Sequence, residues 1–75
     1  MMEGLERFIV AAKAAAFVGG GTILKSSRPS SHNIGFERGN RRYLDSYLGG
    51  TDFLGQETVW QNKQTVWAMN YYGRT

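Results

Sequence analysis

Two carboxylates, Asp45 and Glu57, are the residues best suited to chemistry in this chain. They lie at the two ends of a glycine-rich segment, DSYLGGTDFLGQE, at residues 45–57. A pair of carboxylates can carry out general acid–base catalysis when their environments separate their pKa values. The sequence offers no nucleophile, base and orienting group around them, because the single histidine, His32, lies in another segment. We therefore favour a structural role, in which Asp45 pairs with an arginine such as Arg28, and keep an enzyme that uses Asp45 and Glu57 as an alternative.

The sequence gives no support for a metal or cofactor site. It contains no cysteine and one histidine, so neither a thiolate nor a histidine metal cluster is available. Glycines precede Lys25, as in a phosphate-binding loop, but three residues separate Gly21 from Lys25. A Walker A motif places its lysine directly after its last glycine. We expect no cofactor, no metal and no catalytic residue.

Bulky residues near the C-terminus are the leading candidates for binding. Tryptophan, tyrosine and methionine anchor interfaces, although rings are equally at home in a core. The contact candidates are Trp60, Trp67, Met69, Tyr71 and Tyr72. We expect Arg28, Asp45 and Glu57 to form a polar cluster at one edge of the same region.

Three arginines, Arg38, Arg41 and Arg42, flank the dipeptide Gly39-Asn40. Basic residues with aromatic neighbours can contact phosphates and stack on the bases of single-stranded nucleic acid. The net charge of +3 permits such contacts without requiring them. A solvated hairpin tip is the favoured interpretation, and nucleic-acid binding is a weak alternative.

The elements that position these residues follow from the patterning of a single domain, residues 1–75. Apolar residues recur at helical spacing from Leu5 to Ala16 and predict a helix over about residues 3–17. A polar loop follows over about residues 19–33, within which Thr22–Leu24 is a candidate short strand. Aromatic and β-branched residues then predict an antiparallel meander of three or four strands over about residues 34–72. Gly39-Asn40 and Asn62-Lys63 have the form of two-residue hairpin turns.

The predicted architecture is a two-layer α+β fold, with the helix packed on one face of the sheet. Alternation places Tyr43, Asp45 and Tyr47 on one face of their strand. In the last strand it places Thr65, Trp67, Met69 and Tyr71 on one face and Val66, Ala68, Asn70 and Tyr72 on the other. One short helix cannot cover two faces that both carry rings. We expect an aromatic surface that is either exposed or covered by a partner.

The N-terminal apolar run does not have the form of a targeting segment. Lys13 interrupts it, and Glu6 lies where a signal peptide carries positive charge. The longest unbroken apolar stretch is too short to span a bilayer. We expect a cytoplasmic protein with no membrane partner.

The chain resembles an uncharacterised bacterial family, a domain of unknown function. The resemblance extends from about Leu5 to Gly73 and rests on SSRP, RYLDSYLGGTDFLGQETVW and VWAMNYYG. The matching positions are Arg28, Pro29, Tyr43, Asp45, Tyr47, Gly49, Gly50, Phe53, Gly55, Glu57, Trp67, Met69, Asn70, Tyr71 and Gly73. Members of that family occur alone or behind helix-turn-helix regions of the XRE type, and longer members continue with a second, related half. The resemblance attaches no catalytic activity and implies that this chain corresponds to the first half.

Together these observations predict a small non-enzymatic binding module that recognises a protein or senses a ligand. A protein partner or a second copy of the chain, in a homodimer, is the expected partner. A small phage-type inhibitor of a host complex, similar to anti-CRISPR proteins, is an alternative that rests on size and on the lack of enzymatic motifs. An enzyme using Asp45 and Glu57 is the second alternative.

Overall fold

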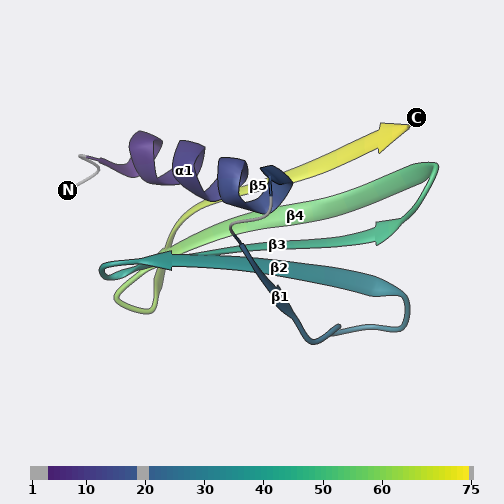
Figure 1. The fold of residues 1–75 in the computed structure, drawn as a ribbon, viewed down its shortest axis with the longest axis horizontal. Helices are drawn as coiled ribbons and strands as arrows, with labels where there is room; N and C mark the ends of the chain where they lie inside the picture. The colour runs from purple at the N-terminus through teal and green to yellow at the C-terminus, as the bar shows by residue number, and fades with distance from the viewer. Residues whose placement is uncertain (1–3, 19–20, 75) are drawn as a thin grey trace.

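The described part of the chain folds into one helix and one antiparallel sheet. The computed structural model describes residues 4–18 and 21–74. The elements are α1 (Leu5–Val18), β1 (Thr22–Leu24), β2 (Ser31–Arg38), β3 (Arg41–Gly49), β4 (Asp52–Gln61) and β5 (Gln64–Arg74). The five strands lie in sequence order, each antiparallel to the next, and α1 lies across one face of the sheet (Figure 1). The predicted two-layer α+β architecture is confirmed.

Helix α1 forms because alanine-rich sequence with apolar residues at helical spacing favours a helix that can rest on a sheet. Its first turn is closed by the Phe8 N–H, which donates to the Gly4 carbonyl at 2.9 Å. Beyond its last turn the Gly21 N–H donates to the Ala15 carbonyl at 3.0 Å. The predicted start at residue 3, and residues 19 and 20 of the predicted loop, lie outside the described residues. Within the described ranges, no helix is long and apolar enough to cross a membrane.

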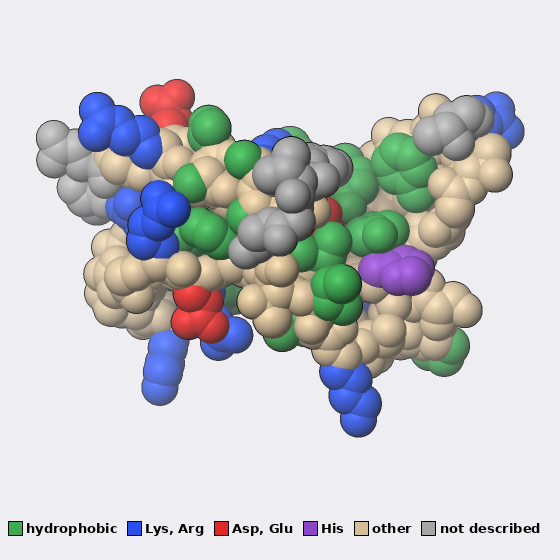
Figure 2. All heavy atoms as spheres, in the orientation of Figure 1, with side chains coloured by type: hydrophobic (Ala, Val, Ile, Leu, Met, Phe, Trp, Pro, Cys, Tyr) green, Lys and Arg blue, Asp and Glu red, His purple; other side chains and the backbone are tan. Residues whose placement is uncertain are grey.

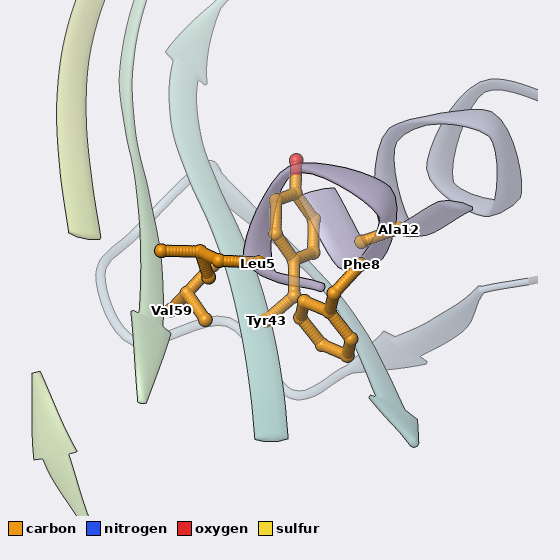
Figure 3. Packing of buried hydrophobic residues seen from close by; sticks show 5 residues of the cluster. All are labelled: Leu5, Phe8, Ala12, Tyr43 and Val59. Atoms are coloured by element: carbon orange, nitrogen blue, oxygen red, sulfur yellow. The ribbon is translucent and has the colours of Figure 1, made fainter. Parts of the chain in front are cut away.

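A small core joins the helix to the sheet. Leu5, Phe8 and Ala12 point from α1 towards Tyr43 of β3 and Val59 of β4 (Figure 3). These five side chains are the buried hydrophobic residues among those described. A core of this size leaves a domain with little stability to spare.

Two hairpin turns match their predicted form. Gly39 has a φ of 64°, which fits a turn that needs glycine at its first central position. Asn62 and Lys63 have φ values of 51° and 69°, as a type I′ turn requires. These turns fix the registers of the β2–β3 and β4–β5 hairpins.

The sheet is larger than predicted, with five strands in place of three or four. Thr22–Leu24 pairs with β2 as a fifth strand, and β2 begins at Ser31 instead of residue 34. Polar residues are accepted at the start of β2 because they bond to the preceding loop. Asn33 Nδ2 donates to the Lys25 carbonyl at 2.8 Å, and Ser31 Oγ donates to the Arg28 carbonyl at 2.8 Å.

A bulge corrects the predicted faces of β5. Trp67 is opposite Val59, as simple alternation requires, but Thr65 is opposite Trp60. The register shift leaves Val66 as the extra residue, and both Val66 and Trp67 pack against the core. Thr65 and Val66 were therefore assigned to the wrong faces. From Trp67 onwards the predicted alternation is correct.

Candidate functional site: a cleft beside the helix

Three rows of side chains cross the sheet on the face that carries α1. Each row is fixed by the strand registers. The core row is Phe36, Tyr43, Val59 and Trp67; the carboxylate row is Ile34, Asp45, Glu57 and Met69; the tyrosine row is His32, Tyr47, Gly55 and Tyr71. Residues of α1 pack on the core row. The carboxylate row forms the floor of a cleft, and the tyrosine row borders it.

The cleft has a volume of about 680 Å³. Its lining comprises Lys13 and Ala16 of α1, His32, Ile34, Asp45, Tyr47, Gly49, Gly50, Phe53, Glu57, Met69 and Tyr71. The space-filling view shows hydrophobic side chains gathered on this side of the molecule, with the histidine among them (Figure 2). The lining is mainly apolar and aromatic, with two carboxylates on the floor.

Asp45 and Glu57 lie directly opposite each other on β3 and β4. They are 5% and 3% exposed. Tyr71 Oη donates to Asp45 Oδ1 at 2.6 Å, and Tyr43 Oη donates to Glu57 Oε2 at 2.8 Å. Each buried carboxylate thus receives one phenolic hydrogen bond from another strand, Glu57 from the adjacent β3 and Asp45 from β5, two strands away.

The two carboxylates differ in whether a cation pairs with them. Lys13 Nζ lies 3.2 Å from Glu57 Oε1 and 5.9 Å from the centre of the Trp67 ring. Glu57 Oε1 has no hydrogen bond among the described residues, so its contact with Lys13 is an ion pair without hydrogen-bond alignment. No ion pair to Asp45 is present in the described part of the chain.

Burial sets the protonation states on the floor of the cleft. It raises the pKa of Asp45, and the nearby charge of Glu57 raises it further, whereas the Tyr71 hydroxyl and Lys13 lower it. Burial, together with the adjoining carboxylates, also raises the pKa values of Tyr43 and Tyr71 well above those of free phenols. Both phenols therefore stay protonated at neutral pH and act as donors.

Rings form the walls of the cleft around this floor. His32 stacks on Tyr47, with ring centres 4.8 Å apart and planes inclined by 27°. Phe53 meets the Tyr71 ring edge-on at 6.3 Å. A side chain at Gly55 would meet Tyr71 Oη at 2.5 Å, so glycine there is what lets Tyr71 lie across β4 and reach Asp45.

The structure brings together most of the predicted site residues. Asp45, Glu57, Met69 and Tyr71 all line the cleft, and Trp67 lies beside it in the core row. Sequence reasoning missed Lys13, His32, Tyr47 and Phe53 as members of the site. For Lys13 a signal existed, since it is the one charge within the apolar run of the helix.

Arg28 does not join this cluster, and that part of the prediction is wrong. It is exposed in the loop before β2, where its backbone N–H donates to Ser31 Oγ at 3.0 Å. Within the described ranges Arg28 forms no ion pair, and Asp45 is bonded to Tyr71 instead. The cation of the cluster is Lys13, which reaches the sheet from the helix.

Trp60 and Tyr72 lie on the opposite face of the sheet. There Leu48, Leu54 and Tyr72 form a cross-strand row, in which Leu54 is 55% and Tyr72 is 68% exposed. Helix α1 packs against the other face, so this row has no covering layer within residues 4–18 and 21–74. Of the expected aromatic surface, this row exposes Tyr72 beside leucine side chains, and it is separate from the cleft.

The three arginines at the β2–β3 hairpin point to different partners. Arg38 lies over the Phe36 ring at 5.2 Å, Arg41 Nε donates to Gln61 Oε1 at 2.9 Å, and Arg42 pairs with Glu37 at 3.3 Å. Each of these contacts engages a cation within the hairpin region.

No cluster of three or more potential metal-ligating side chains occurs among the residues described.

Comparison with known families gives a match over the C-terminal part of the chain. Residues 45–75 match the family described as "Domain of unknown function (DUF5680)". This segment holds Asp45, Glu57, Met69 and Tyr71 but not Lys13 or His32, and it is less than half of the chain. No curated protein and no solved structure matches the chain significantly. The match agrees with the resemblance noted above for this segment, and it assigns no activity.

Proposed function

We propose that this protein is a non-enzymatic binding module that holds a small ligand in the cleft beside α1. The observation that carries the proposal is a cleft of about 680 Å³ with apolar and aromatic walls and a buried carboxylate pair on its floor. Ligand sites generally combine a mostly apolar lining with a few convergent polar groups, in volumes of about 300–1,000 Å³. The cleft has both properties.

The contacts of the polar groups favour binding over catalysis. Asp45 and Glu57 are held by phenols that remain protonated, and Lys13 is engaged with Glu57. Within the described residues His32 makes a ring contact with Tyr47 and no hydrogen bond to a carboxylate or hydroxyl. A nucleophile activated by an adjacent base, which covalent catalysis requires, is not assembled among these groups.

Fragment binding followed by NMR tests this proposal. We would add small aromatic amines, alcohols and acids to ¹⁵N-labelled protein and map the amides that shift. The proposal expects shifts along the carboxylate and tyrosine rows. Ala16→Phe fills the cleft from the helix and should abolish them, whereas Ala14→Phe, on the exposed side of the same helix, should not. Shifts confined to the opposite face of the sheet, or no shifts, would contradict the proposal.

Self-association through β5 is a second candidate function. This strand of 11 residues is the last in the sheet, and its outer edge has no partner strand in the described part of the chain. Unpaired edges of this length are templates for pairing unless charges or proline block them. Here the only charged residue is Arg74, which is paired with Asp52. A second copy could extend the sheet antiparallel across the two β5 edges.

Sedimentation velocity distinguishes this candidate from a monomer. We expect a dimer for the wild-type chain and a monomer for Ala68→Lys, which places a charge near the middle of the β5 edge. Ala14→Lys on the exposed side of α1 is the matched control and should remain a dimer. A wild-type monomer at high concentration would dismiss the candidate.

The resemblance to a family found behind helix-turn-helix regions gives further support to ligand sensing. In such an arrangement a ligand cleft on one domain can bias the state of an attached DNA-binding domain, provided the ligand favours one state over the other. The cleft is the structural observation behind the proposal, and the resemblance supports it by analogy.

A further inference from the structure

We infer that the cleft takes an organic cation, a protonated amine carried on a flat apolar group, with Asp45 as its ion-pair partner. This inference rests on the proposed ligand-binding function and specifies the ligand's chemical class. It follows from the charges on the floor, from the open acceptor of Asp45 and from the rings of the walls.

The floor of the cleft has one more carboxylate than it has paired cations. Glu57 has Lys13 at 3.2 Å, and the same Lys13 Nζ lies 5.9 Å from the centre of the Trp67 ring. The other charged or titratable residues lining the cleft are His32, which is stacked on Tyr47, and the two phenols Tyr47 and Tyr71. Asp45 is thus the carboxylate of the floor that has no ion pair within the described ranges.

Asp45 also has an unused acceptor. Its Oδ1 receives the Tyr71 hydroxyl, whereas no hydrogen bond to its Oδ2 occurs in the described part of the chain, and the residue as a whole is 5% exposed. A largely buried carboxylate without an ion-pair partner is costly in its charged form, and the cost is relieved either by a proton or by a cation that carries N–H groups. Because Asp45 lines the cleft, a ligand ammonium group can supply those N–H groups.

The walls fit the remainder of such a ligand. The rings of Tyr47, Phe53 and Tyr71 surround the floor, and aromatic faces attract an ammonium group held near them. Ile34 and Met69 flank the carboxylates within their own row and offer apolar contact to a hydrocarbon or ring. An anionic ligand would meet two carboxylates, and a neutral one would leave Asp45 Oδ2 without a charged partner.

Three matched probes test the inference by calorimetry at pH 7: 2-phenylethylamine, 2-phenylethanol and 3-phenylpropionate. The amine should bind at least about tenfold more tightly than the alcohol, as one hydrogen bond to a charged group implies, and the acid should bind most weakly. The preference for the amine over the alcohol should shrink as salt is added, because an ion pair is screened.

Two carboxamide variants locate the preference. Asp45→Asn, which can still accept the Tyr71 hydroxyl, should bring the affinity for the amine to that for the alcohol. Asp52→Asn removes an exposed carboxylate paired with Arg74 outside the cleft and should leave the preference intact. Circular dichroism checks that both variants are folded, and the salt dependence of the wild-type preference stands independently of either.

The outcomes separate this inference from the function on which it rests. If the alcohol or the acid binds in the cleft as tightly as the amine, the inference is overturned and the binding function stands. A preference that survives in Asp45→Asn also overturns it. If no probe and no fragment shifts the amides of the cleft, both the inference and the proposed function fail.

Discussion

Asp45 and Glu57 show how two neighbouring carboxylates acquire different roles from their surroundings. Glu57 is held by a phenol and by the ammonium group of Lys13, whereas Asp45 has a phenol alone. The burial of the two side chains is similar, so the difference lies in the cation. This difference is the reason why we propose Asp45, and not Glu57, as the ion-pair partner of the ligand.

Replacing Asp45 by asparagine should flatten the pH dependence of stability. Burial raises the pKa of Asp45, so the folded state holds the carboxyl proton more tightly than the unfolded chain does. In the unfolded chain an aspartate has a pKa of about 3.9. The contribution of Asp45 to the free energy of unfolding is fully present below that value and is lost as the pH rises through the folded pKa. Asparagine cannot ionise and avoids this loss.

Urea denaturation of both proteins between pH 4 and pH 7 is the measurement. We expect Asp45→Asn to be at least as stable as the wild type at pH 7, with its advantage shrinking towards pH 4. The charged and titratable neighbours Glu57, Lys13 and Tyr71 are common to both proteins, so the difference reports Asp45. A variant that is less stable at pH 7, and recovers on acidification, would mean that the ionised carboxylate is stabilising.

Removing the Tyr43 hydroxyl should destabilise the fold by about 1–3 kcal/mol, because a buried carboxylate oxygen would lose its donor. In Tyr43→Phe, Glu57 Oε2 loses its 2.8 Å hydrogen bond. Tyr47→Phe is the matched control, since the Tyr47 hydroxyl makes no hydrogen bond within the described ranges and its loss should be near neutral. Equal midpoints for the two variants in urea would count against the Tyr43–Glu57 bond.

Part of this residue-scale picture could be predicted from the sequence. The sequence indicates Asp45 and Glu57 as a pair because they lie at the two ends of one glycine-rich segment. The pairing of Lys13 with Glu57 and of Tyr71 with Asp45 could not be predicted, because these contacts depend on where the helix crosses the sheet and on the register of β5. Arg28 was assigned to the cluster on charge alone, and its loop leads it away from the cleft.

At the scale of elements, the site depends on one glycine of β4, over which the side chain of Tyr71 crosses from β5. Gly55 leaves room for the Tyr71 ring, and a methyl group there would lie 2.5 Å from Tyr71 Oη and 2.8 Å from the Ser46 carbonyl. We expect Gly55→Ala to cost about 1–3 kcal/mol of stability through this overpacking and to displace the Tyr71 hydroxyl from Asp45.

Gly50→Ala is the control for this variant, because a methyl group at Gly50 meets nothing within 4 Å. Thermal unfolding should show a lowered midpoint for Gly55→Ala and a small change for Gly50→Ala. If both variants unfold together, Gly55 does not limit the position of Tyr71.

The sequence predicted elements well where local chemistry decides them. The helix, both two-residue turns and the alternation of β3 follow from propensity and periodicity. The start of β2 was missed because Ser31 and Asn33 are polar, and their side chains are accepted only through bonds to the loop. The bulge in β5 was missed because nothing in the two-residue alternation of the sequence shows where an extra residue is inserted.

At the scale of the whole molecule, one short helix and a five-stranded sheet leave two unlike surfaces. On the helical side the core row is covered, and the carboxylate and tyrosine rows border a cleft. On the other side the row of Leu48, Leu54 and Tyr72 is open to solvent. The expectation that a single helix cannot cover all the bulky residues is confirmed. Large apolar side chains remain exposed on both faces of the sheet, Met69 on the helical side and Leu54 and Tyr72 on the other.

The most direct test of the cleft as a site for an organic cation is a nuclear Overhauser measurement on the wild-type protein with 2-phenylethylamine. Protons of the bound amine should give cross-peaks to the Ile34 and Met69 methyl groups, which flank Asp45 and Glu57 in the carboxylate row. Cross-peaks to the Leu54 methyl groups on the opposite face of the sheet, or none to the protein at all, would contradict this placement.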